Sequence, residues 1–449
     1  MLLKYTVKNF KSIGNSIEFS MIPTADSSDK RFLTTLHTKL GDIDVLRRGA
    51  FFGPNAAGKS TFMKSIQFAK NYITEPQRSG KNIIFSQFRG DIKELNKTTS
   101  FQFLFYVNGY IYEYGFALTA RRVSEEWLMV LQDMESGAFV SVFTRATDEE
   151  GVTEVEIDES YKFNDENERF LAGILTSSMK KEQKNQLFLY KLKENGVTVA
   201  KEAVNWFEDI EIVFPDSKVR YLPNDVRNDE DFRSFLSEAL EQLDTGIFDI
   251  SASDEKIDFQ DFVQNVSLPL PDELIYGVEN NKNGLFNLGG KYYIFFDDKD
   301  HSSLVQLKFT HMLNNKGTDF SFDDESDGTK RLLNLLPILY NMKYKDTAIY
   351  FVDEIDRSLH TKLSKYLTKT FLEESKESHS QIIFTTHDVN LINLADFSKE
   401  EIWFIEKDIT GETRLRPFSD FETDPRQDII KGYLSGRFGA VPVIKGSDD

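Results

Sequence analysis

The chain contains no cysteine, which excludes disulfide bonds and zinc sites built on thiolates and is compatible with a reducing compartment. It also has no apolar run of about 18 residues, the length that a membrane-spanning helix requires. Residues 1–11 alternate like a strand and lack the apolar stretch of a signal peptide. These absences predict a cytoplasmic protein without a membrane partner.

Positive charge is scarce. Lys and Arg total 54 against 73 Asp and Glu, so the formal net charge is −19. This balance argues against a surface that attracts nucleic acid over most of its area. The six histidines are scattered without the spacing of metal ligands. The densest basic cluster is read as a solvated helix face, with a local binding groove as the alternative: Lys180, Lys181, Lys184, Lys191 and Lys193.

At 449 residues the chain exceeds one average domain, so a large core with an embedded module is expected. Apolar positions follow helical spacing from about residue 165 to 285. Strand-like alternation comes before that stretch and returns at 292–309. The pattern therefore predicts a first lobe at 1–164, a mostly helical insertion at 165–290 and a second lobe at 291–449.

Strand and turn signals are clear in both lobes. The segment 2–21 is expected to form two strands, and 101–117 a hairpin that turns at Asn108-Gly109, a typical two-residue turn. From residue 328 onward the pattern becomes helix, strand, helix, strand, as in a parallel nucleotide-binding sheet. The sequence thus predicts an α/β fold.

The most specific motif lies between an apolar strand at 50–52 and a segment with one apolar helical face. Backbone amides at a helix N-terminus form a positive cradle for phosphates, and glycine lets the chain approach them closely. We expect Lys59 to neutralise the β- and γ-phosphates of a nucleoside triphosphate and Ser60 to hold Mg²⁺. A chance match in a Gly-containing turn is the alternative, and the flanking strand and helix argue against it. The predicted nucleotide-binding residues are Gly53, Pro54, Asn55, Ala56, Ala57, Gly58, Lys59, Ser60 and Thr61.

Two carboxylates follow another apolar strand, 348–352, as Asp353-Glu354. We expect Asp353 to reach the magnesium ion, directly or through water. Glu354 is then placed to orient and deprotonate the attacking water. Alone, this pattern would mark a strand entering a turn. Following a phosphate loop, it indicates the Walker B arrangement.

His387 ends a further apolar strand within Phe-Thr-Thr-His-Asp. Ligands of parallel sheets bind at the carboxyl ends of the strands. A lone histidine is more often structural, but this position is that of a γ-phosphate sensor.

A second anion site is predicted at 325–330, where Glu-Ser-Asp-Gly-Thr-Lys opens an apolar-striped helix. The order of all these elements resembles the ABC-type ATPases related to SMC, RecF and Rad50. In that family this turn is the signature motif, which closes over the triphosphate held by a second subunit. The resemblance carries over Ser326 and Gly328, while Asp327 stands where the family has its first glycine. Asp356 resembles the D-loop that couples the two sites.

Two further matches are looser. Gln87 lies in the interval of the Q-loop, which would place it on the magnesium ion, and an ordinary surface glutamine is an equal alternative. Lys11, in Asn-Phe-Lys-Ser, resembles the strand turn that contacts nucleotide in the relatives of Rad50 and SMC. The resemblance implies ATP and Mg²⁺ as cofactors and an ABC-type P-loop fold, with an N-terminal antiparallel lobe, a parallel-sheet core and a helical insertion.

Several stretches resemble the stand-alone bacterial ATPases of abortive-infection loci, of the AbiL and RloA type, and the ATPase subunit of the PARIS system. The family resemblance implies a homo-oligomer with ATP at its interfaces and a separately encoded effector, often a nuclease or toxin, which the ATPase restrains or triggers when phage is sensed. The stretches are 7–13, 112–116, 123–127, 326–331, 354–360 and 432–439.

Two other classes stay open. A DNA-repair ATPase of the RecF or Rad50 type would clamp DNA when ATP closes the dimer, and the charge of −19 counts against it. A transporter motor would need a docking surface for membrane subunits, and the long insertion and altered signature turn disfavour it.

Overall fold

The computed structural model describes residues 1–24, 29–77, 81–90, 97–179, 184–217, 226, 229–252, 257–258, 264, 284–288, 291–298, 301–344, 348–376, 378–422 and 429–439. The chain divides into two compact units. Unit 1 comprises Met1–Ile212, Asp346–Ile355 and Phe371–Asp449. Unit 2 comprises Val213–Lys345 and Asp356–Thr370.

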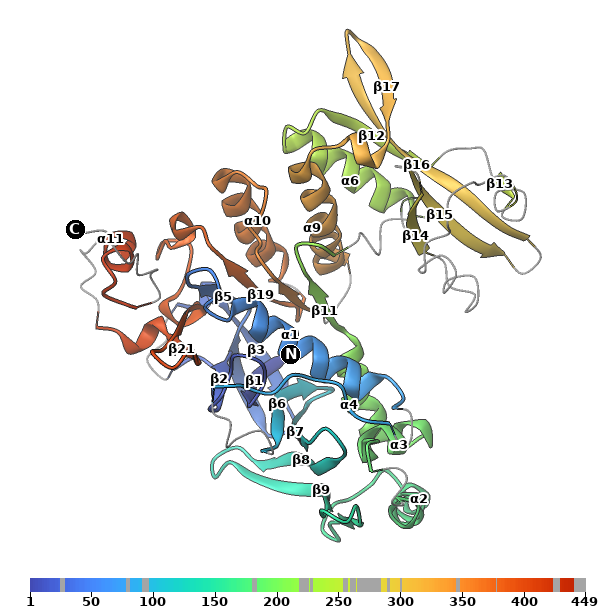
Figure 1. Cartoon of the computed structure of the whole chain (residues 1–449), viewed down its shortest axis with the longest axis vertical. Coiled ribbons are helices and arrows are strands. Elements are labelled where there is room, and N and C mark those ends of the chain that lie inside the picture. The colour runs from blue at the N-terminus through green and yellow to red at the C-terminus, as the bar shows by residue number, and fades with distance from the viewer. Residues whose placement is uncertain are drawn as a thin grey trace. The chain divides into compact units, whose positions relative to one another are not determined.

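Seven strands of unit 1 form an antiparallel sheet in the order β10-β9-β8-β7-β6-β1-β2 (Figure 1). The β6–β7 turn is Asn108-Gly109, and both residues have positive φ, 51° and 84°, as a two-residue hairpin turn requires. The strands are β1 (Leu2–Lys8), β2 (Ile17–Ser20), β6 (Thr99–Val107), β7 (Tyr110–Leu118), β8 (Val123–Asp133), β9 (Ala138–Thr147) and β10 (Thr153–Ile157).

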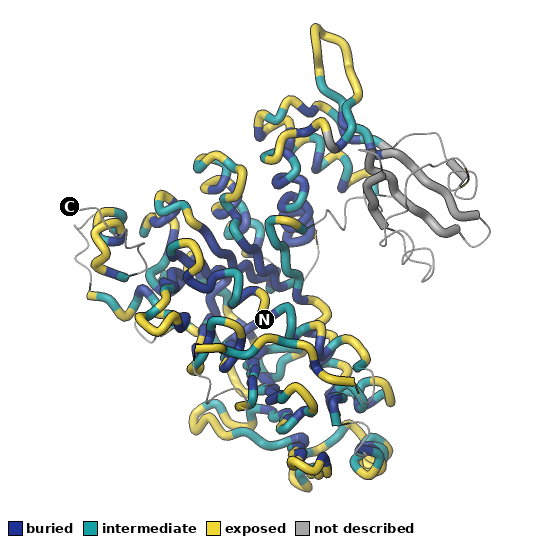
Figure 2. Tube along the Cα trace, viewed as in Figure 1, coloured by how far each residue is buried: buried dark blue, intermediate teal, exposed yellow. Residues whose placement is uncertain are grey.

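The second sheet of six strands has the order β11-β18-β19-β5-β20-β21. Its four strands β18, β19, β5 and β20 run parallel, and β21 pairs antiparallel with β20. Every residue of β5, β18 and β19 is buried (Figure 2), as expected for parallel strands covered on both faces. The strands are β5 (Arg48–Phe52), β11 (Ile210–Val213), β18 (Ile349–Val352), β19 (Gln381–Thr386), β20 (Ile402–Lys407) and β21 (Thr413–Pro417).

Helix α1 (Lys59–Thr74) begins at the end of the phosphate loop and packs against α3 and α4 (Figure 1). Its predicted apolar face is buried, namely Phe62, Ile66, Ala69 and Ile73. The other helices that lie wholly or partly in unit 1 are α2 (Glu166–Ser177), α3 (Phe188–Glu194), α4 (Thr198–Glu208), α10 (Thr361–Glu374, which crosses the division between the units) and α11 (Ile429–Leu434).

Unit 2 is built on a third sheet, of order β12-β16-β15-β14, with β13 and β17 also paired to β16. Helix α6 packs against both β12 and α9. The predicted leucine stripe of α9 is buried, namely Leu332, Leu333, Leu336 and Leu339. The elements are α6 (Glu230–Gln242), β12 (Ile247–Ala252), β13 (Ile257–Asp258), β14 (Gly284–Leu288), β15 (Lys291–Asp298), β16 (His301–Leu313), β17 (Lys316–Phe320) and α9 (Asp327–Tyr344).

A small hairpin and several single turns complete the described elements. Among the described helices, none is both long enough and apolar enough to cross a membrane. The elements are β3 (Leu33–Thr38), β4 (Gly41–Leu46), η1 (Lys30–Phe32), η4 (Phe322–Asp324), η5 (Val389–Leu391), η6 (Lys399–Glu401) and η7 (Phe418–Asp420).

The predicted α/β class, with an antiparallel N-terminal lobe and a parallel core, is confirmed. The helical reading of 165–285 differs in part from the structure, because β11, β12, β13 and β14 lie in that stretch beside the helices. In addition, residues 165–212 belong to unit 1, where α3 and α4 pack on α1. Periodicity identifies a helix but does not say what the helix packs against. The three segments 1–164, 165–290 and 291–449 stay a prediction of domain organisation.

Candidate nucleotide-binding site

The loop between β5 and α1 has the backbone that the glycine pattern predicts. Ala56 and Gly58 both have positive φ, 62° and 119°. A Cβ at Gly58 would lie 2.2 Å from Oγ1 of Thr413, and one at Gly53 would lie 2.2 Å from the carbonyl oxygen of Ile405. Neither position has room for a side chain, so β20 and β21 press directly on the loop.

The loop borders a cavity of about 600 Å³ in unit 1. Ten of the predicted site residues meet there, although they come from four separate parts of the chain: Lys11, 55–61, Glu354 and His387. The cavity is lined by Lys11, Ser12, Asn55, Ala56, Ala57, Gly58, Lys59, Ser60, Thr61, Glu354, His387 and Lys407.

The ammonium of Lys59 is buried within its own loop. It donates to the carbonyl oxygens of Gly53 at 2.5 Å and Pro54 at 2.9 Å, and it lies 3.2 Å from Nδ1 of His387. Each of these contacts can be exchanged for a phosphate oxygen, which is an ionised and stronger acceptor. The lysine is therefore already aimed at the place where phosphates would enter.

Asp353 and Glu354 follow β18 and have different surroundings. Asp353 is buried, and its Oδ1 accepts a hydrogen bond of 2.7 Å from the Thr385 hydroxyl. Glu354 lines the cavity, has a φ of +49°, and places Oε1 3.6 Å from Nε2 of His387. Glu354 therefore lines the cavity, whereas Asp353 is buried and does not, and the roles of both carboxylates stay predictions.

Hydrogen bonds from outside the loop also hold it at Ala57 and Thr61. The Thr413 hydroxyl donates to the carbonyl oxygen of Ala57 at 3.1 Å and lies 2.9 Å from the hydroxyl of Ser12. The Ser12 hydroxyl in turn donates to Oγ1 of Thr61 at 3.3 Å. Sequence reasoning missed both Ser12 and Thr413, because the fold brings them to the loop from opposite ends of the chain, Ser12 in the β1–β2 connection and Thr413 at the start of β21.

Two further lysines line the cavity, Lys11 and Lys407. Burial lowers the pKa of Lys11, and the nearby ammonium of Lys64 lowers it further. Together with Lys59 these ammonium groups make the cavity locally positive in a chain whose net charge is −19. Such a field favours a polyanionic ligand. Lys407 ends β20, but no motif in the sequence marked it.

The residues around the loop fit Mg²⁺. This ion prefers oxygen ligands, and the predicted site residues include the Ser60 hydroxyl, which lines the cavity, and the Asp353 carboxylate directly after β18. Burial of a carboxylate is costly unless a cation or hydrogen bonds compensate it, which suits an ion held near Asp353. Among the described residues no cluster of three or more His, Asp or Glu forms a separate metal centre.

The predicted signature turn lies in unit 2. The Ser326 hydroxyl accepts from the Thr329 amide at 3.1 Å, so it caps α9. A Cβ at Gly328 would lie 2.9 Å from the carbonyl oxygen of Ser358, so the turn packs closely against the segment that begins at Asp356. The carboxylate of Glu325, one residue before the turn, contacts Nε2 of His311 at 2.6 Å.

Gln87 lies elsewhere in unit 1 and is absent from the lining of the cavity. Its amide donates to the carbonyl oxygen of Lys97 at 2.6 Å. Its role on the magnesium ion stays a prediction.

The AAA_21 family model, described as “AAA domain, putative AbiEii toxin, Type IV TA system”, matches residues 50–393. The matched stretch contains the phosphate loop, the signature turn, Asp353-Glu354 and His387. A comparison with curated proteins finds no match.

Several solved structures show a distant likeness of fold over most of the chain. The SMC head domain from Thermotoga maritima has 15% identity and a TM-score of 0.36, covering 94% of this chain and 99% of that chain. The SmcHead bound to the C-winged helix domain of ScpA has 14% identity and a TM-score of 0.40, covering 92% and 97%. The Smc head domain with an extended coiled coil, bound to the C-terminal domain of ScpA and derived from Pyrococcus furiosus, has 13% identity and a TM-score of 0.36, covering 92% and 95%.

The family match spans well over half of the 449 residues. It includes the cavity-lining residues from the loop after β5 to His387. Three features of the structure agree with this family match. Gly53 and Gly58 are tightly packed, Lys59 is buried in the loop, and Asp353-Glu354 follows the parallel strand β18. This chain belongs to the AAA_21 family of AAA-domain proteins.

Proposed function

We propose that this protein binds ATP with Mg²⁺ in the cavity beside the phosphate loop and hydrolyses it to ADP and phosphate. The observation that carries the proposal is the convergence of Lys59, Glu354 and His387 on one cavity, with Asp353 next to Glu354 in the chain and bonded to the Thr385 hydroxyl. These residues come from the ends of α1, β18 and β19, where a parallel sheet presents its ligand site.

The reaction follows from their chemistry. Lys59 and the loop amides bind the β- and γ-phosphates, and Mg²⁺, when bound near Ser60 and Asp353, supplies further positive charge. A water attacks the γ-phosphorus, and the bond from that phosphorus to the β–γ bridging oxygen breaks with its electron pair leaving on ADP. Glu354 takes the proton of the water, and His387 donates a hydrogen bond to the γ-phosphate.

Steady-state ATPase assays test this assignment. Lys59→Ala is expected to abolish ATP binding, because the loop loses its only side-chain cation. Glu354→Gln is expected to bind ATP normally but to turn over roughly 100-fold more slowly or worse, the usual loss for a general base. Glu154→Gln, an exposed carboxylate on β10, is the matched control and should behave like the wild type. Unchanged turnover in both site variants would remove the assignment.

The proposed biological role is that of a switch in an anti-phage system of abortive infection, working in the cytoplasm. Two copies would close around ATP, with Ser326, Gly328 and Asp356 of one copy completing the site of the other. ATP turnover would then control a separately encoded nuclease or toxin when a phage component is sensed. The resemblance of the sequence motifs to defence ATPases supports this role, as does the family description, which names a toxin of a toxin–antitoxin system.

Co-expression with the products of neighbouring genes tests the role. A stable complex that contains a small nuclease or toxin, and that changes its activity when Glu354→Gln traps ATP, is expected. A complex with DNA-repair factors alone would contradict it.

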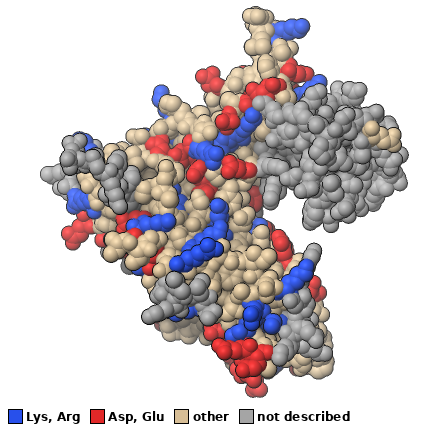
Figure 3. Space-filling view, in the orientation of Figure 1, with Lys and Arg blue, Asp and Glu red and all other residues tan. Residues whose placement is uncertain are grey.

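The second candidate is a RecF- or Rad50-like ATPase that binds DNA on dimerisation. On the face shown in Figure 3, basic and acidic side chains are interspersed over the described residues. Lys193 of the predicted basic cluster pairs with Glu208 at 2.6 Å, while Lys180 and Lys181 lie outside the described residues. A DNA affinity that falls steeply with salt, together with DNA-stimulated hydrolysis, would favour this candidate.

A further inference from the structure

The hydroxyl of Thr385 contacts both residues of the acidic pair, the carboxylate of Asp353 and the backbone amide of Glu354. Thr385 is on β19, two residues before His387, and is fully buried. Its hydroxyl donates to Oδ1 of Asp353 at 2.7 Å and accepts from the backbone amide of Glu354 at 2.8 Å. One small side chain therefore contacts both consecutive residues of the acidic pair.

The backbone of Thr385 adds a third contact. Its carbonyl oxygen accepts from the amide of Ile355 at 2.9 Å. The amides on both sides of the Glu354 Cα are thus bonded to the same residue of the neighbouring strand. The chain beyond β18 is fixed to β19 at the point where it turns toward the cavity.

This fixation matters because the backbone of Glu354 is unfavourable. Its φ of +49° lies in the left-handed region, where a residue other than glycine costs on the order of 1 kcal/mol or more. Such a conformation persists only when its surroundings hold it. The hydrogen bonds to Thr385 are the observed restraint on each side of it.

A left-handed residue also directs its side chain differently from an extended one. If Glu354 relaxed to negative φ, its carboxylate would leave the position 3.6 Å from Nε2 of His387. At the same time Asp353 would lose the donor that orients its Oδ1 inside a buried site. Both changes follow from the loss of a single hydroxyl.

We propose that Thr385 is a positioning residue for ATP hydrolysis, whose hydroxyl sets the Glu354 carboxylate against the attacking water and orients Asp353. This inference rests on the proposed ATPase function. Its hydroxyl bonds to Asp353 and Glu354, and it lines no part of the cavity among the described residues. We therefore expect its loss to affect the chemical step and to leave binding by the phosphate loop intact.

Two variants of Thr385 separate the effect of its hydroxyl from that of its methyl group, and a third variant elsewhere serves as the control. Thr385→Val keeps the shape and removes the hydroxyl, while Thr385→Ser keeps the hydroxyl and removes a methyl group. Thr147→Val is the matched control, because Thr147 is also buried in a strand and its hydroxyl contacts Oγ1 of Thr153 at 3.0 Å, on the β9–β10 hairpin. For each variant, kcat, KM, the Kd of a fluorescent ATP analogue and Tm are measured.

Thr385→Val is expected to lower kcat by roughly 10- to 100-fold, the loss that follows a displacement of about 1 Å in a catalytic group. Its Kd for the analogue should stay within about 2-fold of the wild type, because binding by the loop is untouched. Thr385→Ser should restore kcat to within about 3-fold, and Thr147→Val should leave every kinetic value unchanged.

Glu354→Gln is assayed alongside. If Glu354→Gln stops turnover and Thr385→Val does not, the positioning role is overturned and the ATPase assignment stands. If Thr385→Ser loses as much as Thr385→Val at equal Tm, the methyl packing matters and the hydroxyl role is overturned. If neither Glu354→Gln nor Thr385→Val changes turnover, the ATPase assignment itself fails. Should Thr385→Val not fold, Thr385→Cys, a poor hydrogen bonder of similar size, must show the same loss of kcat at unchanged Kd.

Discussion

At the residue scale, unfavourable backbone conformations gather around the cavity. Ala56, Gly58 and Glu354 all have positive φ. Gly58 is enclosed by Thr413 of β21, and the Glu354 amide is bonded to Thr385 of β19. In residues other than glycine, such as Ala56 and Glu354, this conformation costs about 1–3 kcal/mol and persists where the surrounding structure holds it. The loop and the acidic pair are therefore set in place before nucleotide arrives, which lowers the cost of organising them on binding.

Gly58→Ala tests the loop geometry. The alanine would have an unfavourable φ of +119°, and its Cβ would collide with Thr413 Oγ1. We therefore expect ATP binding to be lost or weakened by roughly 10-fold or more. Gly411→Ala is the matched control, because Gly411 has a φ of +79° but open space around it. Gly411→Ala should lower the free energy of unfolding through its unfavourable backbone conformation alone and leave the Kd for ATP unchanged. Equal Kd values for the two variants would contradict the role given to the packing of Gly58.

The residues that sequence reasoning found and those it missed differ in one respect. Lys59, Glu354 and His387 stand in local motifs whose spacing reflects a strand end and a helix start. Ser12, Thr413 and Thr385 act through contacts across the sheet, and no local pattern records which strands become neighbours. Asn108-Gly109 was predictable as a turn because its conformational requirement is local.

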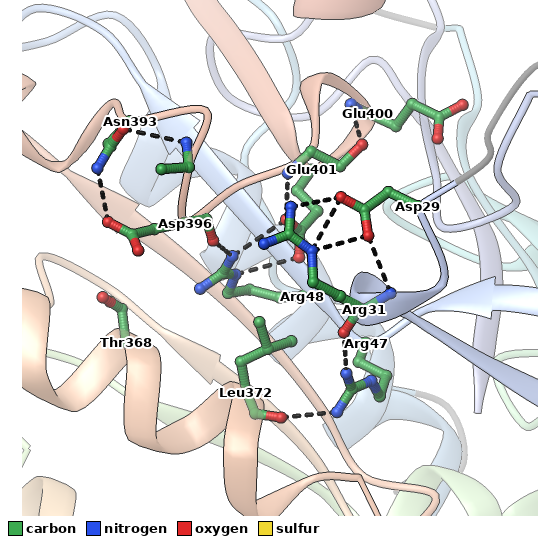
Figure 4. A network of polar contacts seen from close by, with 12 residues as sticks. Asp29, Arg31, Arg47, Arg48, Thr368, Leu372, Asn393, Asp396, Glu400 and Glu401 are labelled. Atoms are coloured by element: carbon green, nitrogen blue, oxygen red, sulfur yellow. Dashed lines mark hydrogen bonds and ion pairs between the residues drawn. The ribbon is translucent and has the colours of Figure 1, made fainter.

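At the element scale, β5 carries the loop and is anchored at its first residue by a buried ion pair (Figure 4). The guanidinium of Arg48 donates to both carboxylate oxygens of Glu401, each at 3.1 Å, and lies 3.6 Å from the ring centroid of Phe397. It also donates to the carbonyl oxygen of Asp396. Neighbouring Arg47 donates to the carbonyl oxygen of Leu372 at 2.6 Å. These contacts fix the start of β5 to the segment before β20 and to the last turn of α10.

Arg48→Ala is expected to reduce the free energy of unfolding by about 3–5 kcal/mol, because it leaves the Glu401 carboxylate buried without its cation. Urea denaturation measures this loss. Arg48→Met combined with Glu401→Leu should recover most of it, since the two buried charges are then removed together. A double variant as unstable as Arg48→Ala would contradict the account.

The pH dependence of Arg48→Ala follows from the same pair. Burial raises the pKa of Glu401 above its ordinary value of 4.5, while Arg48 and the amide of Ser398 lower it. Removing Arg48 therefore raises this pKa further. The folded state then binds the proton more tightly than the unfolded state, so the stability of the variant should fall as pH rises from about 4.5 through the folded pKa. Denaturation curves at several pH values measure this trend. A loss of stability, relative to the wild type, that becomes smaller as pH rises would contradict the prediction.

At the scale of the whole molecule, the predicted nucleotide motifs are divided between two units. The phosphate loop, Asp353, Glu354 and His387 belong to unit 1, whereas Ser326, Gly328 and Asp356 belong to unit 2. The division falls between Ile355 and Asp356, within one predicted motif. The sequence predicted the parallel core and the antiparallel lobe, but it did not predict which unit takes residues 165–212, since helix periodicity carries no information about packing partners.

Mixing of two inactive variants tests whether the site is shared between copies. Lys59→Ala removes the loop cation and Ser326→Ala removes the signature hydroxyl, and each alone is expected to be inactive as an ATPase. Co-expression should restore part of the activity, because a mixed pair has one site in which both residues are intact. If mixed pairs are shown to form but their ATPase activity does not exceed that of the separate variants, a shared site is contradicted.

The central claim is that the cavity beside residues 53–61 hydrolyses ATP with Glu354 as the base. Single-turnover hydrolysis of ATP labelled at the γ-phosphate, measured together with ATP binding on the same samples, tests it most directly. We predict that Glu354→Gln binds ATP as tightly as the wild type and releases no labelled phosphate over several wild-type half-times. Release at the wild-type rate, or loss of binding in Glu354→Gln with binding retained in Lys59→Ala, would contradict it.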